Sequence, residues 1–214
     1  MSRVSATDPS TPIEAKGAVR VLTLSTTAFT VMFAVWLMFG ILGQPIQQEF
    51  GLSDVELSWI SAVAILNGSM WRLPAGMLAD RFGGRVVMLV ILGFSAVASL
   101  AVSFAQNYWM LLVLAFLVGF AGNSFSVGVA WNSAWYSKDR QGLALGIFGA
   151  GNVGASVTKF IGPPIIAATA GTVVLGFIPG GWRLIPVIYT ALLVVLFLAT
   201  FLATPVNDRK AGAN

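Results

Sequence analysis

The stretch GSMWRLPAGMLADRFGGR, residues 68–85, begins as part of an apolar helix and ends in a charged turn. Asp80 is expected near the end of that helix, and Arg72 comes eight residues earlier, a rise of about 12 Å. In a helix that crosses a membrane, Arg72 would lie close to mid-depth, where an arginine costs roughly 2.5–3.5 kcal/mol on insertion scales. An explanation of the fold must therefore also explain this charge.

The whole chain is apolar enough to be an integral membrane protein. Of its 214 residues, 57% are hydrophobic and 9% are charged, unlike an ordinary soluble domain. Apolar runs that can cross a bilayer, about 20 residues each, recur along it, and they are too long and uniform for barrel strands. We predict an all-α membrane protein with six transmembrane helices. The predicted spans are Val21–Gly43, Ser58–Ala79, Val86–Ala105, Trp109–Trp135, Leu143–Ala168 and Leu184–Ala203.

The basic residues predict the orientation. Nine of them fall in alternate connections and in both tails, against Arg183 alone on the other side, so the positive-inside rule places both termini in the cytoplasm. The nine are Arg3, Lys16, Arg20, Arg81, Arg85, Lys138, Arg140, Arg209 and Lys210. We expect residues 1–18 to form a disordered cytoplasmic tail, 19–204 a six-helix transmembrane domain, and 205–214 the start of a cytoplasmic linker or C-terminal tail.

Several classes of function are disfavoured. The chain has no His and no Cys, which removes the commonest metal ligands, so we expect no metal and no cofactor. Its eight acidic residues fall in tails, loops or helix ends, where they cannot serve a membrane enzyme inside the bundle; we expect no enzyme. The excess of positive charge follows from topology and predicts no nucleic-acid partner.

Arg72 lies on a small or polar strip of the second span. The strip contains Ser61, Ile65, Gly68, Ser69, Arg72, Ala75, Gly76 and Ala79. No acidic residue is predicted at the depth of Arg72, so its partner is either another chain segment or an anion, and we favour the anion. Pro74 predicts a bend just after Arg72, although an ordinary membrane kink has the same signature.

The fifth span has two predicted faces. Gly142, Gly146, Ala150 and Gly154 repeat every four residues, a pattern typical of close helix packing. The polar residues Asn152, Ser156 and Lys159 lie roughly opposite, where they could line a pathway, form helix-helix hydrogen bonds, or, for Lys159, snorkel to an interface.

Polar stripes occur on two further spans. They contain Thr23, Thr27 and Thr30 on the first span, and Gly119, Asn123, Ser126 and Ser133 on the fourth, with Phe125 beside them. Four polar faces in one bundle indicate a region of water or substrate. The full charges expected there, Arg72 and Lys159, are both positive and favour a small anion. Arginine can bind a planar oxyanion through paired hydrogen bonds, and phosphate, sulfate and carboxylates also fit, so these residues alone predict only a small anion.

The segment GMLADRFGGR resembles the loop between the second and third helices of major facilitator superfamily transporters. The matching residues are Gly76, Asp80, Arg81, Gly83 and Arg85, and the final basic position of the motif is Val86 here. The resemblance implies that these residues hold a cytoplasmic gate through contacts with the second half of such a transporter.

Three stretches resemble the nitrate/nitrite porter (NarK-type) family within that superfamily: WRLPAGMLADRFGGR, GNSFSVGVAWNSAWYSKDRQG and GIFGAGNVGASVTKF. The resemblance implies that Arg72 binds the substrate, that Phe125 lies beside the anion, and that Gly151, Asn152 and Gly154 belong to the nitrate signature. With Ser156 and Lys159 of the polar stripe, these are the expected substrate-binding residues. Lys159 after the signature resembles the branch of proton-coupled nitrate importers.

Members of this family have about twelve helices, and the chain resembles their N-terminal half. The implied function is nitrate or nitrite transport by alternating access in the plasma membrane, by proton symport or by nitrate/nitrite exchange. We expect a second six-helix half, as a separate chain, a missing C-terminal half or a second copy, and no activity without it. The alternative is a non-transporting membrane subunit or anion sensor.

Overall fold

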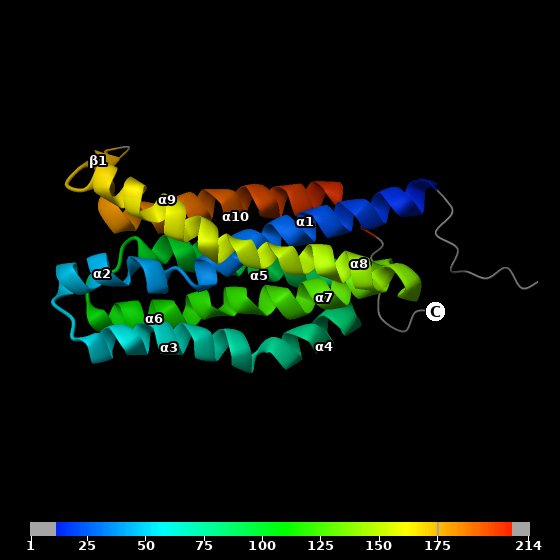
Figure 1. Ribbon diagram of the computed structural model, residues 1–214, viewed down its shortest axis with the longest axis horizontal. Coiled ribbons are helices and arrows are strands. Elements are labelled where there is room, and N and C mark those ends of the chain that lie inside the picture. The colour runs from blue at the N-terminus through cyan, green and yellow to red at the C-terminus, as the bar shows by residue number, and fades with distance from the viewer. Residues whose placement is uncertain (1–11, 175, 207–214) are drawn as a thin grey trace, which may run out of the picture.

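The computed structural model describes residues 12–174 and 176–206. Its helices run along the long axis of an elongated bundle (Figure 1). The α-helices are α1 (Pro12–Trp36), α2 (Phe39–Phe50), α3 (Asp54–Met70), α4 (Arg72–Phe82), α5 (Gly84–Val102), α6 (Tyr108–Gly119), α7 (Ser124–Trp135), α8 (Lys138–Gly149), α9 (Gly154–Thr169) and α10 (Leu184–Ala203). The 3₁₀ turns are η1 (Phe120–Asn123), η2 (Ala150–Val153) and η3 (Gly181–Arg183), and the strands β1 (Val173–Val174) and β2 (Ile178–Pro179) form an antiparallel hairpin.

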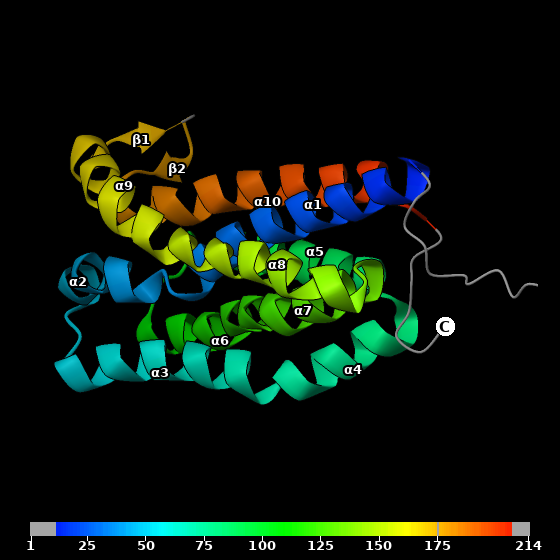
Figure 2. The same cartoon turned by 45° about the vertical axis from the view of Figure 1, so that its right-hand side comes forward.

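The predicted all-α membrane fold is confirmed, with one difference in the second span. Within the described residues, five spans are long and apolar enough to cross a membrane: α1–α2, α5, α6–α7, α8–α9 and η3–α10. The second span is divided at Trp71 into α3, with 17 residues, and α4, with 11. The two helices follow one another end to end (Figure 2), and together they occupy the place of the second predicted span.

Two predicted boundaries are corrected. Helix α1 begins at Pro12, so residues 12–18 are helical and not part of a disordered tail. The first span also runs through α2 to Phe50, beyond the predicted end at Gly43, and stops at Gly51, which has a φ of 61° and forms a left-handed cap. The remainder of the predicted N-terminal tail and residues 207–214 lie outside the described residues.

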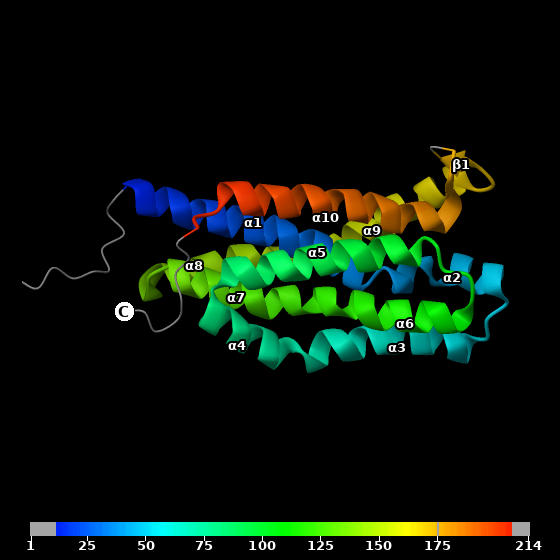
Figure 3. The same ribbon diagram turned by 180° about the vertical axis from the view of Figure 1, so that it is seen from behind.

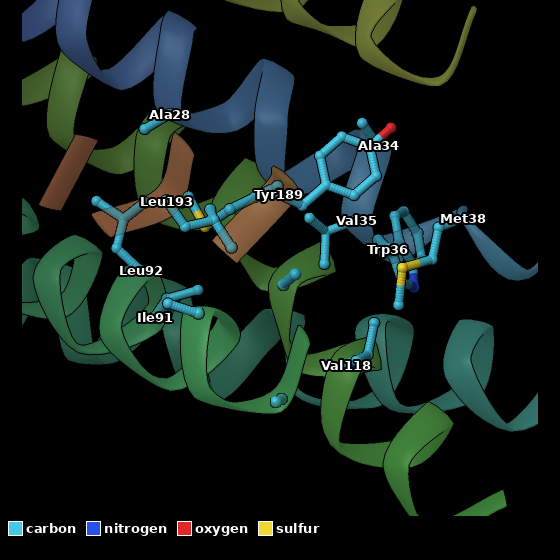
Figure 4. Packing of buried hydrophobic residues seen from close by; sticks show 14 of the residues in the cluster. Ala28, Ala34, Val35, Trp36, Met38, Ile91, Leu92, Val118, Tyr189 and Leu193 are labelled. Carbon is cyan, nitrogen blue, oxygen red and sulfur yellow. The ribbon is translucent and has the colours of Figure 1, made fainter. Parts of the chain in front are cut away.

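Helix α1 runs through the middle of the hydrophobic core. It packs against α7, α9 and α10, while α10 packs along α5 and α3 along α6. Figure 4 shows Val35 of α1 near side chains of α5, α6 and α10. Val35, Val118, Ile91, Leu92 and Leu193 have no exposed surface. The core of the bundle is therefore complete around α1 within this chain.

The bundle has two distinct ends. The start of α1 and the end of α10 lie at one end, which we call the proximal end, and the α2–α3 connection and the β1–β2 hairpin lie at the other, the distal end (Figure 3). Arg183, the basic residue predicted to lie opposite the termini, is at the start of α10 and so at the distal end.

Arg183 ties three segments together at the distal end. It forms an ion pair with Glu49 of α2 at 2.5 Å. The same guanidinium donates hydrogen bonds to the carbonyl oxygens of Ser103 and Ala105 at 2.9 and 2.7 Å. Glu49 also accepts a hydrogen bond from the Trp182 indole at 2.6 Å. The ends of the first, third and sixth spans are thereby held in register.

Arg85 makes the equivalent connection at the proximal end. Its Nε donates to the hydroxyl of Thr204 at 2.9 Å, and its Nη2 donates to the carbonyl oxygen of Phe201 at 2.7 Å. Carbonyl groups in the last turn of a helix have no partner within that helix, and a cation there also favours the helix dipole. Arg85 therefore caps α10 from the start of α5.

Replacing Glu49 by Ala should destabilise the distal end. The substitution removes the acceptor of both Arg183 and Trp182, and the pair is only partly exposed, with 13% of the Arg183 side chain accessible. We expect a loss of about 1 kcal/mol, measured as a lower melting temperature of the detergent-solubilised chain. Asp139→Ala, which removes the exposed partner of Arg140 at 3.9 Å, is the control and should leave the melting temperature nearly unchanged.

Replacing Arg85 by Gln should destabilise the chain more strongly. The change removes two charge-assisted hydrogen bonds from a buried site, so we expect a loss of about 2 kcal/mol in the same thermal measurement. Arg81→Gln is the control because Arg81 lies four residues before Arg85 and its side chain is exposed. Equal melting temperatures for the two variants would contradict the capping role of Arg85.

Candidate anion site at the broken second span

The second span is interrupted immediately before Arg72. Trp71 has φ −87° and ψ 2°, outside the α-helical region, and α4 starts with Arg72. Pro74 is the third residue of α4, where its missing N–H removes the hydrogen bond that would have joined it to the carbonyl of Met70. The predicted bend therefore exists, but it lies at Trp71, three residues before the proline that causes it.

Arg72 has aromatic neighbours and no acidic one. Its Cζ lies 5.4 Å from the centroid of the Trp36 ring and 5.7 Å from that of Phe125, within the range of cation–π attraction. The ion pairs among the described residues are Arg140–Asp139 and Arg183–Glu49, so Arg72 belongs to neither. Its Nε is buried without a hydrogen-bond partner in the described structure. A buried donor of this kind is expected to bind an acceptor.

Phe125 is held in place by a cluster of aromatic rings. Its centroid lies 5.4 Å from that of Phe29 and 5.9 Å from that of Phe148, and the latter two rings stack at 4.9 Å. Gly128 makes room for this cluster, because a Cβ there would collide with the Phe148 ring. The aromatic wall beside Arg72 is therefore fixed from α1, α7 and α8 together.

The breaks in the fourth and fifth spans pack onto the same part of α1. Gly122 of η1 contacts the Trp36 ring, and Gly151 of η2 contacts Phe29. Gly154 contacts the backbone of Thr30 so closely that a Cβ would overlap it. Three interrupted helices thus surround the segment of α1 from Phe29 to Trp36, next to Arg72.

The expected substrate-binding residues of the fifth span separate into two groups. Gly151 and Gly154 are buried against α1, whereas Asn152 of η2 and Ser156 and Lys159 of α9 are exposed. The Asn152 amide donates to the carbonyl oxygen of Gly149 at 2.9 Å. The structure gives the two glycines a packing position, and the predicted contacts of these five residues with an anion stay predictions.

The predicted packing row of the fifth span is only partly right among the described residues. Gly154 packs against α1, but a Cβ placed at Gly142 or Gly146 would meet no atom within 4 Å, and Ala150 is exposed. The row that packs is instead Gly151, Gly154 and Gly162, against α1 and α2. A repeat of small residues every four positions identifies a face that permits close contact, but it does not say which neighbour fills it.

The threonine stripe of the first span is largely satisfied by its own helix. Thr27 and Thr30 donate their hydroxyls to the carbonyl oxygens of Thr23 and Thr26, each at 2.8 Å. On the fourth span Asn123 is fully buried and donates to the carbonyl of Phe120 at 3.0 Å. These residues therefore contribute less free hydrogen-bonding capacity than the sequence pattern indicates.

The predicted gate motif lies at the proximal end of α4. Asp80 and Arg81 are exposed, and a Cβ added at Gly76 would lie 3.8 Å from the Cβ of Ser126 on α7. Gly83 has a φ of 95°, which explains why glycine suits this turn. Arg85 differs from the other basic residue of the motif because it is buried and engaged with α10.

Of the residues that cluster around Arg72, the sequence predicted Phe125 but gave no sign of Trp36, Phe29 and Phe148. These three rings lie on spans where aromatic residues at helical spacing are ordinary core residues. Only the fold brings them together around Arg72. The structure does not bring Lys159 to this cluster, since Lys159 lines a separate cavity between α1–α2, α3 and α9.

Comparison with known proteins shows that the chain is similar to parts of membrane transporters. The family model described as Major Facilitator Superfamily matches residues 24–214. A probable nitrate/nitrite antiporter of Thermus thermophilus is 64% identical over 194 residues, which cover 90% of this chain and 44% of that protein. A nitrite extrusion protein of Bacillus subtilis is 31% identical over 189 residues, with 88% and 45% covered. The chain therefore spans about half the length of these curated relatives.

A solved structure supports the fold. The inward-facing, unoccupied form of a bacterial homologue of the human lysosomal transporter Spinster matches with a TM-score of 0.71 at 18% identity. The match covers 95% of this chain and 45% of that one. With the spans described above, these comparisons make the chain a multi-pass protein of the plasma membrane. It belongs to the major facilitator superfamily.

Proposed function

We propose that the chain is the anion-binding half of a nitrate/nitrite transporter that works by alternating access. The observation that carries the proposal is Arg72, whose guanidinium lies at a helix break between Trp36 and Phe125 with its Nε unpaired in the described structure. Relatives named as nitrate/nitrite antiporter and nitrite extrusion protein support the choice of anion. In this proposal the protein is a transporter and not an enzyme.

The chemistry of the site suits a small planar oxyanion. A guanidinium donates parallel hydrogen bonds to two oxygens of one ligand. The ring faces of Trp36 and Phe125 attract the guanidinium, and because they donate no hydrogen bonds to a large hydration shell, the site favours a weakly hydrated ion. Nitrate and nitrite match this description, whereas a cation would be repelled by Arg72. Asn152 of η2 and Ser156 of α9, both exposed, are proposed to contact the same anion during transport.

Exchange of nitrate for nitrite is the coupling mode that requires no proton carrier from this chain. It has no His, and Glu49 is occupied by Arg183 and Trp182 at the distal end. A proton-coupled mechanism would need a proton carrier inside the pathway, and Lys159, water, the substrate or a second half would have to supply it. Anion exchange has no such requirement.

A second six-helix half is proposed to complete the pathway. The curated relatives are about twice as long as the aligned region. In the α8–α9 span 28% of the most apolar stretch is buried and in η3–α10 33%, compared with 56% in α1–α2, α5 and α6–α7. Of these two less buried spans, α8–α9 carries the exposed residues Asn152 and Gly146. The half is proposed to dock here and against the exposed gate residues Asp80 and Arg81, with both termini in the cytoplasm.

Nitrate binding by the chain alone tests the role of Arg72. We expect saturable nitrate binding to the chain in lipid nanodiscs, measured by titration calorimetry, and at least tenfold weaker binding for Arg72→Ala, which corresponds to about 1.4 kcal/mol or more. Arg72→Lys should also bind more weakly because it keeps the charge but loses the paired donors. Arg81→Ala is the matched control, and a loss of affinity as large as that of Arg72→Ala would contradict the assignment.

Flux separates a transporter from an anion sensor. We expect no saturable nitrate uptake into proteoliposomes that contain the chain alone, and Arg72-dependent uptake when a second half is reconstituted with it. Uptake driven by internal nitrite without a pH gradient supports exchange, while a strict need for an inward proton gradient would contradict it. Binding without flux in the complete assembly would show that the protein is a sensor or subunit.

A further inference from the structure

A cavity of about 270 Å³ lies beside the Arg72 site without including it. Its wall comes from α1 and α2, from α3 and from α9, and contains Trp36, Phe39, Ser61, Ala64, Ala155 and Lys159. Most of this wall is apolar. The polar residues of the wall are Ser61 and Lys159, and neither side chain has a hydrogen-bond partner among the described residues.

Trp36 separates this cavity from Arg72. The indole lines the cavity, and the Arg72 Cζ lies 5.4 Å from the same ring. The indole N–H donates to the carbonyl oxygen of Ala64 at 2.9 Å, and Gly68 and Gly122 pack against the ring so tightly that a Cβ at either would collide with it. The Trp36 ring is therefore held in place, and it contacts both the cavity and Arg72.

The cavity lies on the distal side of Arg72. Helix α9 runs alongside the first span, with Gly154 against Thr30 and Gly162 against Ile41, which brings Lys159 level with the break between α1 and α2. On α3, Ser61 precedes Arg72 by 11 residues, on the order of 15 Å along the helices. An ion that enters from the distal end would meet Lys159 before Arg72.

The charge of Lys159 is available to a ligand. It forms no ion pair with any residue that the structure describes, and Glu49, the acidic residue nearest the end of α2, is held by Arg183. A charge beside an apolar wall attracts counter-ions more strongly than one in bulk water. Lysine binds as a point charge with three rotatable donors and does not demand the paired geometry that arginine does, which suits a site where an ion stays briefly.

We infer that the Lys159 cavity is a second anion-binding site, in which a small monovalent anion is held on the distal side of the Trp36 ring before it reaches Arg72. The inference rests on the proposed anion function of Arg72 for its place in a pathway. Its defining property, a cation-lined cavity separate from Arg72, can be measured independently. Binding at Lys159 should be weaker and less selective than binding at Arg72.

The absence of Cys from the sequence makes the test direct. Ser61→Cys places a single thiol in the cavity, and its rates of reaction with an anionic and a cationic methanethiosulfonate reagent are compared in nanodiscs, each relative to a free thiol. We expect about a tenfold preference for the anionic reagent, loss of that preference in Lys159→Met, and its reversal in Lys159→Glu. Ala155→Cys serves as a second reporter of the same cavity.

Two controls locate the effect. Ser137→Cys, at the proximal end of α8, should show the same reagent preference with and without Lys159. Millimolar nitrate should slow the labelling of Ser61→Cys by the anionic reagent, and this protection should persist in Arg72→Ala but disappear in Lys159→Met.

The outcomes distinguish this inference from the proposed function. Protection that disappears in Arg72→Ala would overturn the second site and leave Arg72 as the anion site. A reagent preference that Lys159→Met does not change would also overturn it. Protection that persists in Arg72→Ala, together with a Lys159-dependent preference, supports the second site even if the chain transports an anion other than nitrate.

Discussion

A guanidinium at the middle of a membrane span without a carboxylate partner is the constraint that the rest of this structure answers. The insertion cost of such a group is roughly 2.5–3.5 kcal/mol, and evolution usually offsets it with an acid or a water-filled cavity. Here the offsets within the described chain are the faces of Trp36 and Phe125. Ring faces attract a cation but accept no strong hydrogen bond, so the guanidinium keeps donors for an external oxyanion.

The interruptions in three of the spans lie around the Arg72 guanidinium. Arg72 follows the break at Trp71, and the breaks at η1 and η2 let α1 approach the fourth and fifth spans through glycines. Each break frees backbone groups, which is tolerable in a membrane only where protein or a wet cavity surrounds them. The continuous helices α5 and α10, tied by Arg85 at one end and joined to the Arg183 cluster at the other, pack along one another without a break.

The sequence was sufficient for the fold, because hydropathy is a local signal, and it singled out Arg72 and Phe125, whose binding of an anion stays a prediction. The sixth span matches α10 at both ends, and Arg72 and Phe125 are indeed neighbours. The partners of Phe125 could not be predicted, since Phe29 and Phe148 look like any core residues until the spans are packed. The predicted glycine row was wrong at Gly142 and Gly146 for a related reason. These two glycines lie on a face that has no neighbour among the described residues. Arg85 was assigned to a gate by its motif, whereas only the fold shows its cap on α10.

The most direct measurement of the central claim is the distance between nitrate and Arg72 in the membrane-embedded protein. Rotational-echo double-resonance NMR can report this distance with ¹⁵N-nitrate and protein labelled with ¹³C at arginine Cζ. The Arg72→Lys variant removes the Arg72 Cζ signal and serves as the control. The account predicts dephasing that corresponds to about 4 Å, as for a paired arginine–oxyanion contact, and its loss in Arg72→Lys. Dephasing that is absent at saturating nitrate, or unchanged in Arg72→Lys, would contradict the claim that an anion completes this site.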